Sequence, residues 1–135
     1  RLLAQARAAH GVALLVDWHS MPSAAAQGPG RRGACDIVLG DRFGAACAPA
    51  ITALVEKAFI ELGYRCVRNA PYAGGYTTEH YGRPSRRTHA LQVEMNRALY
   101  MDETTRVAND GFDRLRRDIG VVTARLAGFD WSSLR

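Results

Sequence analysis

The apolar positions of this chain change their spacing several times, and each spacing predicts a different element. Four stretches are predicted to be strands: residues 12–16, 36–40, 64–67 and 89–95. The first is a short, continuous apolar run, which is typical of a strand buried on both faces. The fourth alternates, with Leu91 and Val93 facing one way and Gln92 and Glu94 the other.

Other segments repeat their apolar positions every three or four residues, which indicates helices that bury one face. These segments are residues 1–10, 49–62 and 103–126. Gly11 and Gly63 follow the first two, and glycine commonly ends a helix. Strands and helices that alternate along the chain predict a single α/β domain over residues 1–135, a layered sheet, mixed or parallel, flanked by helices.

Two long loops are predicted, at residues 21–34 and 69–82. The second contains Gly74 and Gly75, which let a backbone approach a ligand, among several tyrosines that provide rigid contact area. The patterns GxxxxGK[ST] and GxGxxG are absent, which excludes a phosphate loop of either kind. The alternative is an ordinary long turn with packed tyrosines.

Composition narrows the class of protein. The chain is 47% hydrophobic and 23% charged, as folded soluble proteins are, and no apolar stretch approaches the roughly 18 residues of a membrane span. Three cysteines without metal-site spacing predict core residues in a reducing cytoplasm. Neither a secretory signal nor an initiator Met is present, so we expect a portion of a longer protein.

The net charge of +5 is concentrated in one third of the chain. Residues 65–97 hold six arginines against Glu79 and Glu94, which gives +4. Guanidinium groups bind carboxylates and phosphates through two parallel hydrogen bonds. A compact segment of this kind suits a small anionic substrate, and we expect neither nucleic acid nor a membrane as partner.

His19 follows the first predicted strand, in Asp17-Trp18-His19-Ser20. Ligands of α/β sheets bind at the carboxyl ends of strands, and a His held there suits a metal ligand or a general base. Asp17 is spaced to share its face and to orient the imidazole. The alternative is a His that only hydrogen-bonds the following loop.

Glu94 lies inside the last predicted strand, with no Lys or Arg at cross-strand spacing in that segment. A buried carboxylate is costly unless it is paired or close to a metal, and one in a cleft suits a general base. The alternative is an ion pair with Arg97 or with a neighbouring strand.

Four ordered segments together resemble the N-formylglutamate amidohydrolase family. They are LLVDWHSMPS around His19, DIVLGDRFGAAC (residues 36–47), NAPYAGGYTTEHYGRP (69–84) and HALQVEMNRALYMDE (89–103). The resemblance implies a zinc-exopeptidase-like fold of the phosphorylase/hydrolase type. It also implies metal-dependent hydrolysis of a linear amide, N-formyl-L-glutamate to formate and L-glutamate, in the histidine degradation of bacteria.

By the same similarity, His19 is expected to bind zinc or another divalent metal and Glu94 to act as general base. Tyr76 and Thr77 are expected to close over the ligand. The family takes further metal ligands from an earlier segment, which has no counterpart in this chain, so we expect them to come from elsewhere. A competing set within the chain, His19 with His80 and His89, is less favoured because His80 falls in a predicted loop.

The implied substrate is a small anionic N-acyl amino acid, whose carboxylates arginine side chains would bind. The candidates are Arg83 and Arg97, with Arg42 third. The rival hypothesis is a non-catalytic amidohydrolase-like module that binds an acidic amino acid derivative.

Overall fold

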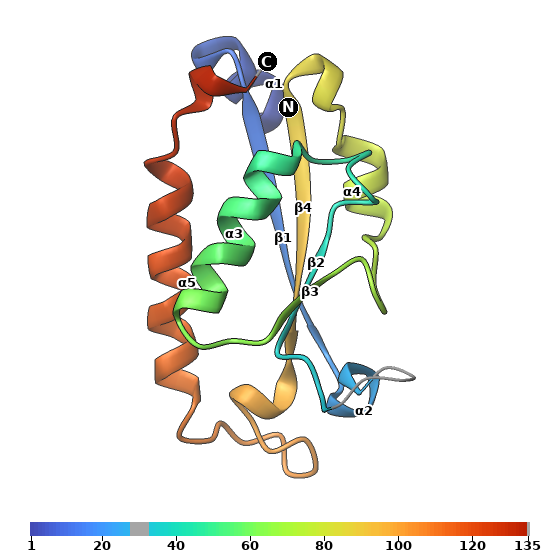
Figure 1. Ribbon diagram of the computed structural model, residues 1–135, viewed down its shortest axis with the longest axis vertical. Helices are drawn as coiled ribbons and strands as arrows, with labels where there is room; N and C mark the ends of the chain where they lie inside the picture. The colour runs from blue at the N-terminus through green and yellow to red at the C-terminus, as the bar shows by residue number, and fades with distance from the viewer. Residues whose placement is uncertain (28–32, 135) are drawn as a thin grey trace.

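A computed structural model describes residues 1–27 and 33–134 (Figure 1). The helices and strands, in chain order, are α1 (Leu2–His10), β1 (Ala13–Met21), α2 (Ser23–Ala26), β2 (Ile37–Gly40), α3 (Pro49–Glu61), β3 (Cys66–Arg68), α4 (Tyr76–Tyr81), β4 (Thr88–Asn96) and α5 (Phe112–Ala127). Three short 3-10 helices, η1 (Pro84–Arg86), η2 (Arg97–Leu99) and η3 (Trp131–Ser133), complete the path.

The four strands form one mixed sheet in the order β1-β4-β2-β3. β1 runs parallel to β4, β2 parallel to β3, and β2 antiparallel to β4. The long helices α3 and α5 pack against each other across one face of this sheet (Figure 1). The predicted α/β architecture, a layered mixed sheet flanked by helices, is therefore confirmed.

Alternation along the strands decides which side chains enter the core. Leu39, Leu91 and Val93 point toward α3 and α5 and are buried with Phe59 and Val122 of those helices. The intervening residues point to the other face, where α4 packs on β4. That second face carries the polar residues discussed below.

The element ends lie within two residues of the sequence prediction, except in three places. β1 continues to Met21 because its parallel pairing with β4 extends through the polar residues of that segment, so His19 lies within the strand. The loop predicted at residues 69–82 contains the helix α4. The helix predicted from residue 103 begins only at Phe112, since the Asp102 carboxylate accepts hydrogen bonds from the Thr104 and Thr105 N–H groups and holds a turn there.

The other predicted features are accounted for as follows. α1 ends at Gly11, which adopts a left-handed conformation (φ 72°), and Gly63 after α3 does the same (φ 91°). The loop predicted at residues 21–34 includes the short helix α2, and its residues 28–32 lie outside the described part. Across residues 1–27 and 33–134, no helix has the length and apolar character that crossing a membrane requires.

The cysteines are core residues, as predicted. All three are free thiols; Cys35 and Cys47 are buried and Cys66 is half-buried. Burial raises the pKa of the Cys47 and Cys66 thiols to about 12, so both stay protonated at neutral pH. Neither is therefore suited to nucleophilic or metal-binding chemistry.

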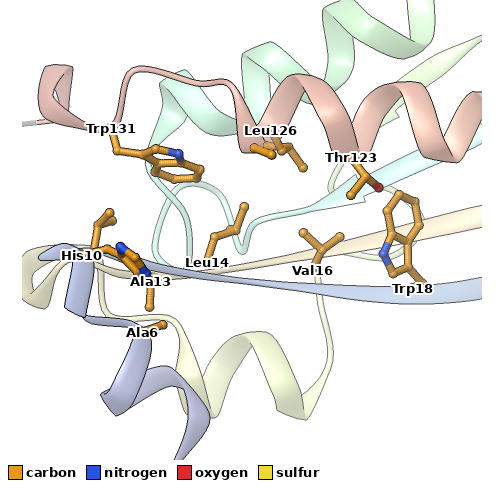
Figure 2. A pocket seen from close by; sticks show the side chains of 11 residues that line it. Ala6, His10, Ala13, Leu14, Val16, Trp18, Thr123, Leu126 and Trp131 are labelled. Carbon is orange, nitrogen blue, oxygen red and sulfur yellow. The ribbon is translucent and has the colours of Figure 1, made fainter. Parts of the chain in front are cut away.

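An apolar pocket of about 560 Å³ lies beside β1, between α1 and α5 (Figure 2). Leu14, Val16 and Trp18 of β1 point into it toward Leu126 of α5, and Trp131 lies at one end. Trp18 and His19 are neighbours in sequence but point to opposite faces of the sheet. A lining this apolar does not suit a charged substrate, so the polar face of the sheet is the better candidate.

Candidate functional site

The register of β1 and β4 brings the two predicted catalytic side chains together. His19 pairs with Glu94, and Asp17 pairs with Gln92. Residues opposite each other on neighbouring strands point to the same face, so all four side chains meet on the face that α4 covers. The Nδ1 atom of His19 lies 3.9 Å from Oε1 of Glu94.

Asp17 orients the imidazole in the way that its spacing predicts. Its Oδ2 atom lies 3.1 Å from Nε2 of His19. A carboxylate at this nitrogen favours the tautomer with hydrogen on Nε2, which leaves the lone pair of Nδ1 facing Glu94. Asp17 therefore holds the imidazole in place. The His19 side chain is also 48% exposed, which leaves it open to a ligand. Within residues 1–27 and 33–134, the side-chain partners of His19 are Asp17 and Glu94, and no hydrogen bond to the following loop is found.

Glu94 is 6% exposed and is held by neutral partners. The Nε2 group of Gln92 donates a hydrogen bond to Oε1 of Glu94 (2.8 Å), and the Gly75 N–H donates to Oε1 of Gln92 (2.7 Å). The alternative of an ion pair between Glu94 and Arg97 is wrong, because the Arg97 guanidinium donates to Ser20 instead. Glu94 is thus a buried carboxylate beside an imidazole, without a cationic Arg or Lys partner among the described residues.

Gln92 is the residue of this site that sequence reasoning missed. It connects the glycine loop before α4 to Glu94 through two hydrogen bonds. The available signal was its spacing of two residues from Glu94, which places both side chains on one face. A polar pair on that face of a buried strand indicates a shared site.

The described residues do not assemble a complete metal centre. No group of three or more His, Cys, Asp or Glu side chains that could hold a metal ion occurs within residues 1–27 and 33–134. His19 is suitably oriented for one ligand, but zinc sites require about three.

The competing set of His19 with His80 and His89 does not form either. His89 accepts a hydrogen bond from the Ala48 N–H at its Nδ1 atom, and burial lowers its pKa, so it is a neutral structural residue. The His80 ring stacks on Tyr76, with centroids 5.0 Å apart.

The three candidate arginines lie in three different places. Arg42 donates to the Gly74 carbonyl and pairs with Glu79 of α4, next to the loop that binds Gln92. Arg97 lies at the carboxyl end of β4, but its partner Ser20 points to the face opposite His19.

Arg83 lies near the beginning of β4, where it bridges to Thr88. Thr88 and Glu94 are separated along β4 by about 20 Å, at about 3.3 Å per residue. Of the three candidate arginines, Arg42 is the one that contacts the loop bound to Gln92.

Tyr76 and Thr77 begin α4 directly after Gly75. Tyr76 is 70% exposed, and its hydroxyl lies 3.2 Å from Nδ1 of His80. Thr77 is half-buried, and the next residue, Thr78, is buried and donates to the Gly75 carbonyl. Both predicted residues thus lie on the short helix that borders the site, where their contact with a ligand stays a prediction.

Gly40 sets how closely this loop approaches the sheet. A Cβ atom at Gly40 would lie 2.6 Å from the Gly74 nitrogen and 2.8 Å from the Ala73 carbonyl carbon, which is closer than packing allows. We expect Gly40→Ala to lower the free energy of unfolding by about 1–3 kcal/mol and to displace the loop from Gln92. Chemical denaturation measures the first effect. The matched control is Gly120→Ala, where an added Cβ meets nothing within 4 Å; equal stability of both variants would contradict the prediction.

Comparison with known proteins identifies the family of the chain. The N-formylglutamate amidohydrolase family matches residues 1–101. An N-formylglutamate deformylase of Pseudomonas aeruginosa is 41% identical over 103 residues, which is 75% of this chain and 38% of that protein. The protein of the same name from Pseudomonas putida is 39% identical over 70 residues, 51% of this chain and 26% of that protein.

A solved structure shows the same fold. The crystal structure of N-formylglutamate amidohydrolase from Ralstonia eutropha JMP134 superimposes with a TM-score of 0.86 at 41% identity, covering 93% of this chain and 46% of that one. The chain thus spans less than half the length of each of these relatives. The family match over residues 1–101 and the shared fold show that the chain belongs to the N-formylglutamate amidohydrolase family.

Proposed function

We propose that this chain contributes its polar sheet face to an enzyme that hydrolyses N-formyl-L-glutamate to formate and L-glutamate. One observation carries the proposal: the parallel register of β1 and β4 places the His19 imidazole beside the buried Glu94 carboxylate. The relatives named for this substrate support the choice of reaction. A role in histidine degradation in the cytoplasm follows as part of the same proposal.

Glu94 is the proposed general base. Gln92 donates its hydrogen bond to Oε1 of Glu94. The described residues make no hydrogen bond to the Oε2 atom of Glu94, so this oxygen is available to a water molecule. Glu94 takes a proton from that water while the oxygen attacks the formyl carbon. The C–N bond then breaks, and the protonated Glu94 returns the proton to the departing amine of glutamate.

His19 is the proposed second contact to the reacting group. Asp17 fixes its Nε2 side, so Nδ1 faces the space beside Glu94. We propose that His19 is also one ligand of a divalent metal such as zinc, and the described residues contain no group of three or more side chains that would complete its site. A bound zinc ion would supply polarisation of the formyl carbonyl.

Arg42 is the proposed contact to a substrate carboxylate. It lies beside the Gly74–Gly75 loop, and its present partner Glu79 is largely exposed, so a ligand carboxylate can replace it. Tyr76 and Thr77 border the same side of the site, and the substrate is proposed to lie between this helix and Glu94.

Formate release tests the proposed reaction. The protein that carries this chain is incubated with N-formyl-L-glutamate, and formate and L-glutamate are measured together with bound metal. Equimolar formation of the two products is expected. Binding of the substrate without formate release would instead support the rival hypothesis of a non-catalytic module that holds an acidic amino acid derivative.

Replacing Arg42 by Lys should raise KM for N-formyl-L-glutamate by about tenfold or more, with a smaller change in kcat. An ammonium group cannot make the bidentate contact, and a lost charge-assisted hydrogen bond costs about 1.5–3 kcal/mol. Steady-state kinetics measure this effect, with Arg117→Lys on the exposed side of α5 as the control. An unchanged KM in Arg42→Lys would remove Arg42 from the substrate site.

A further inference from the structure

A second pocket, with a volume of about 300 Å³, lies between α1, the end of α4 and η1. Its neighbour α1 lies at the end of the molecule that carries the N-terminus (Figure 1). The side chains that give it its character are Arg1, Arg7, Arg83, Arg86, His80 and Tyr81. Its lining includes Thr88 at the start of β4, so it lies about 20 Å along that strand from Glu94.

The pocket has an uncompensated positive charge. Four arginines and one histidine are among the residues that line it, and no Asp or Glu is among them. Arg7 donates to the Arg86 carbonyl, and Arg83 donates to the Glu79 and Gly82 carbonyls, all of which are neutral groups. None of the ion pairs found among residues 1–27 and 33–134 includes these arginines.

Arg86 is the side chain that is best placed to receive a ligand. The described residues give its guanidinium no hydrogen bond and no ion pair, while its own carbonyl fixes Arg7 beside it. Like charges that line one pocket raise the energy of the free protein, and an anion bound there lowers it. Arginines from α1, η1 and the residue before η1 line this one concave site, which favours an ion with several acceptor oxygens.

From this geometry we propose that the pocket binds a small molecule through its phosphate group. A phosphate carries up to two negative charges and accepts hydrogen bonds from several guanidinium groups at once. A carboxylate has only two oxygens, and one or two guanidinium groups use all of its acceptor sites. Tyr81, packed edge-on against His80 with centroids 4.6 Å apart, provides an aromatic wall for the organic part of such a ligand. The concave shape distinguishes the site from a surface that follows a nucleic-acid backbone.

The site borders the proposed substrate contacts without overlapping them. His80 lines the pocket and stacks on Tyr76, which begins the same short helix. The preceding residue, Gly75, donates to Gln92, the partner of Glu94. A phosphate ligand at one end of α4 therefore stabilises the helix that borders the candidate hydrolytic site at its other end.

Calorimetric titration of the protein that carries this chain tests the proposal. The probes are inorganic phosphate and pyrophosphate, at constant ionic strength. Saturable binding with a stoichiometry of one is expected for both probes. Arg7→Gln/Arg86→Gln should weaken it by at least about tenfold, because a factor of ten corresponds to the loss of about one charge-assisted hydrogen bond. Arg106→Gln/Arg117→Gln removes the same charge from exposed positions outside the pocket and should change binding less than about twofold.

Other outcomes would overturn the site. One is an absence of binding by either probe, and another is equal weakening of phosphate binding in both double variants. Displacement of phosphate by L-glutamate would also contradict it, as would tighter binding of a DNA duplex than of pyrophosphate at the same salt concentration. Thermal unfolding verifies that the variants fold. Arg86→Gln alone removes no side-chain hydrogen bond or ion pair found among the described residues, and it gives the same test if the double variant is unstable.

A sugar phosphate titrated in parallel distinguishes the source of the phosphate. Tighter binding of the sugar phosphate than of inorganic phosphate would show that Tyr81 contacts the organic part. Equal affinity would limit the pocket to the phosphate group itself, which still supports the site.

Discussion

Glu94→Gln should lower the turnover of N-formyl-L-glutamate by about 10²–10⁴-fold while the substrate still binds. The amide of Gln keeps the shape of the side chain and accepts the hydrogen bond from Gln92, but it cannot take a proton from water. Single-turnover kinetics together with equilibrium binding of the substrate separate the two effects. Because Glu94 has neutral hydrogen-bond partners, the free energy of unfolding should change little.

The matched control is Glu61→Gln, which removes an exposed carboxylate that pairs with Lys57 and Arg125. Surface ion pairs contribute little to stability, and Glu61 lies on α3, which covers the other face of the sheet. We expect its turnover to stay within about twofold of the unchanged protein. If Glu94→Gln retains turnover and loses stability instead, Glu94 is a structural carboxylate and the proposed base is wrong.

His19→Ala should lower the zinc content of the protein that carries this chain by at least about tenfold, and its turnover with it. A lost imidazole ligand has no substitute nearby, since Ser20 points to the opposite face of the sheet. Metal analysis after dialysis against a zinc buffer measures the first effect and formate release the second. His10→Ala, at an exposed position at the end of α1, is the control.

Asp17→Asn separates a ligand role of His19 from a merely local one. It leaves the His19 imidazole in place but removes the carboxylate at Nε2, and such partners typically contribute 10–100-fold to metal affinity. Zinc content that is unchanged in both His19→Ala and Asp17→Asn would exclude His19 as a ligand. A loss of turnover at constant zinc content would leave it as a polar contact to the substrate.

The sequence by itself determined the features that depend on local geometry. Side chains alternate along a strand, so the spacing of Leu91, Gln92, Val93 and Glu94 was enough to place Glu94 on the polar face. Glycine at position 11 predicted where α1 ends, because a helix commonly ends at a residue in the left-handed conformation. The α/β class followed from the order of these local patterns.

The sequence pattern did not predict the start of α5 or the presence of α4. Asp102 holds a turn over residues that carry a helical pattern, and the first turn of α5 therefore starts later than predicted. The helix α4 was missed because its six residues, YTTEHY, are too few to show a period, and its formation rests on packing against β4.

Only the tertiary structure decided which of the candidate residues meet. His19 and Glu94 are brought together by the register between β1 and β4, and a shift of one residue would turn one of them to the other face. Arg83 lies at the far end of β4 from Glu94, in a pocket with Arg7 and Arg86, whereas Arg42, which is more distant in sequence, contacts the loop that binds Gln92. Pairing between distant segments is set by the packing of the whole sheet and its helices, and this information is not contained in the local pattern of any one segment.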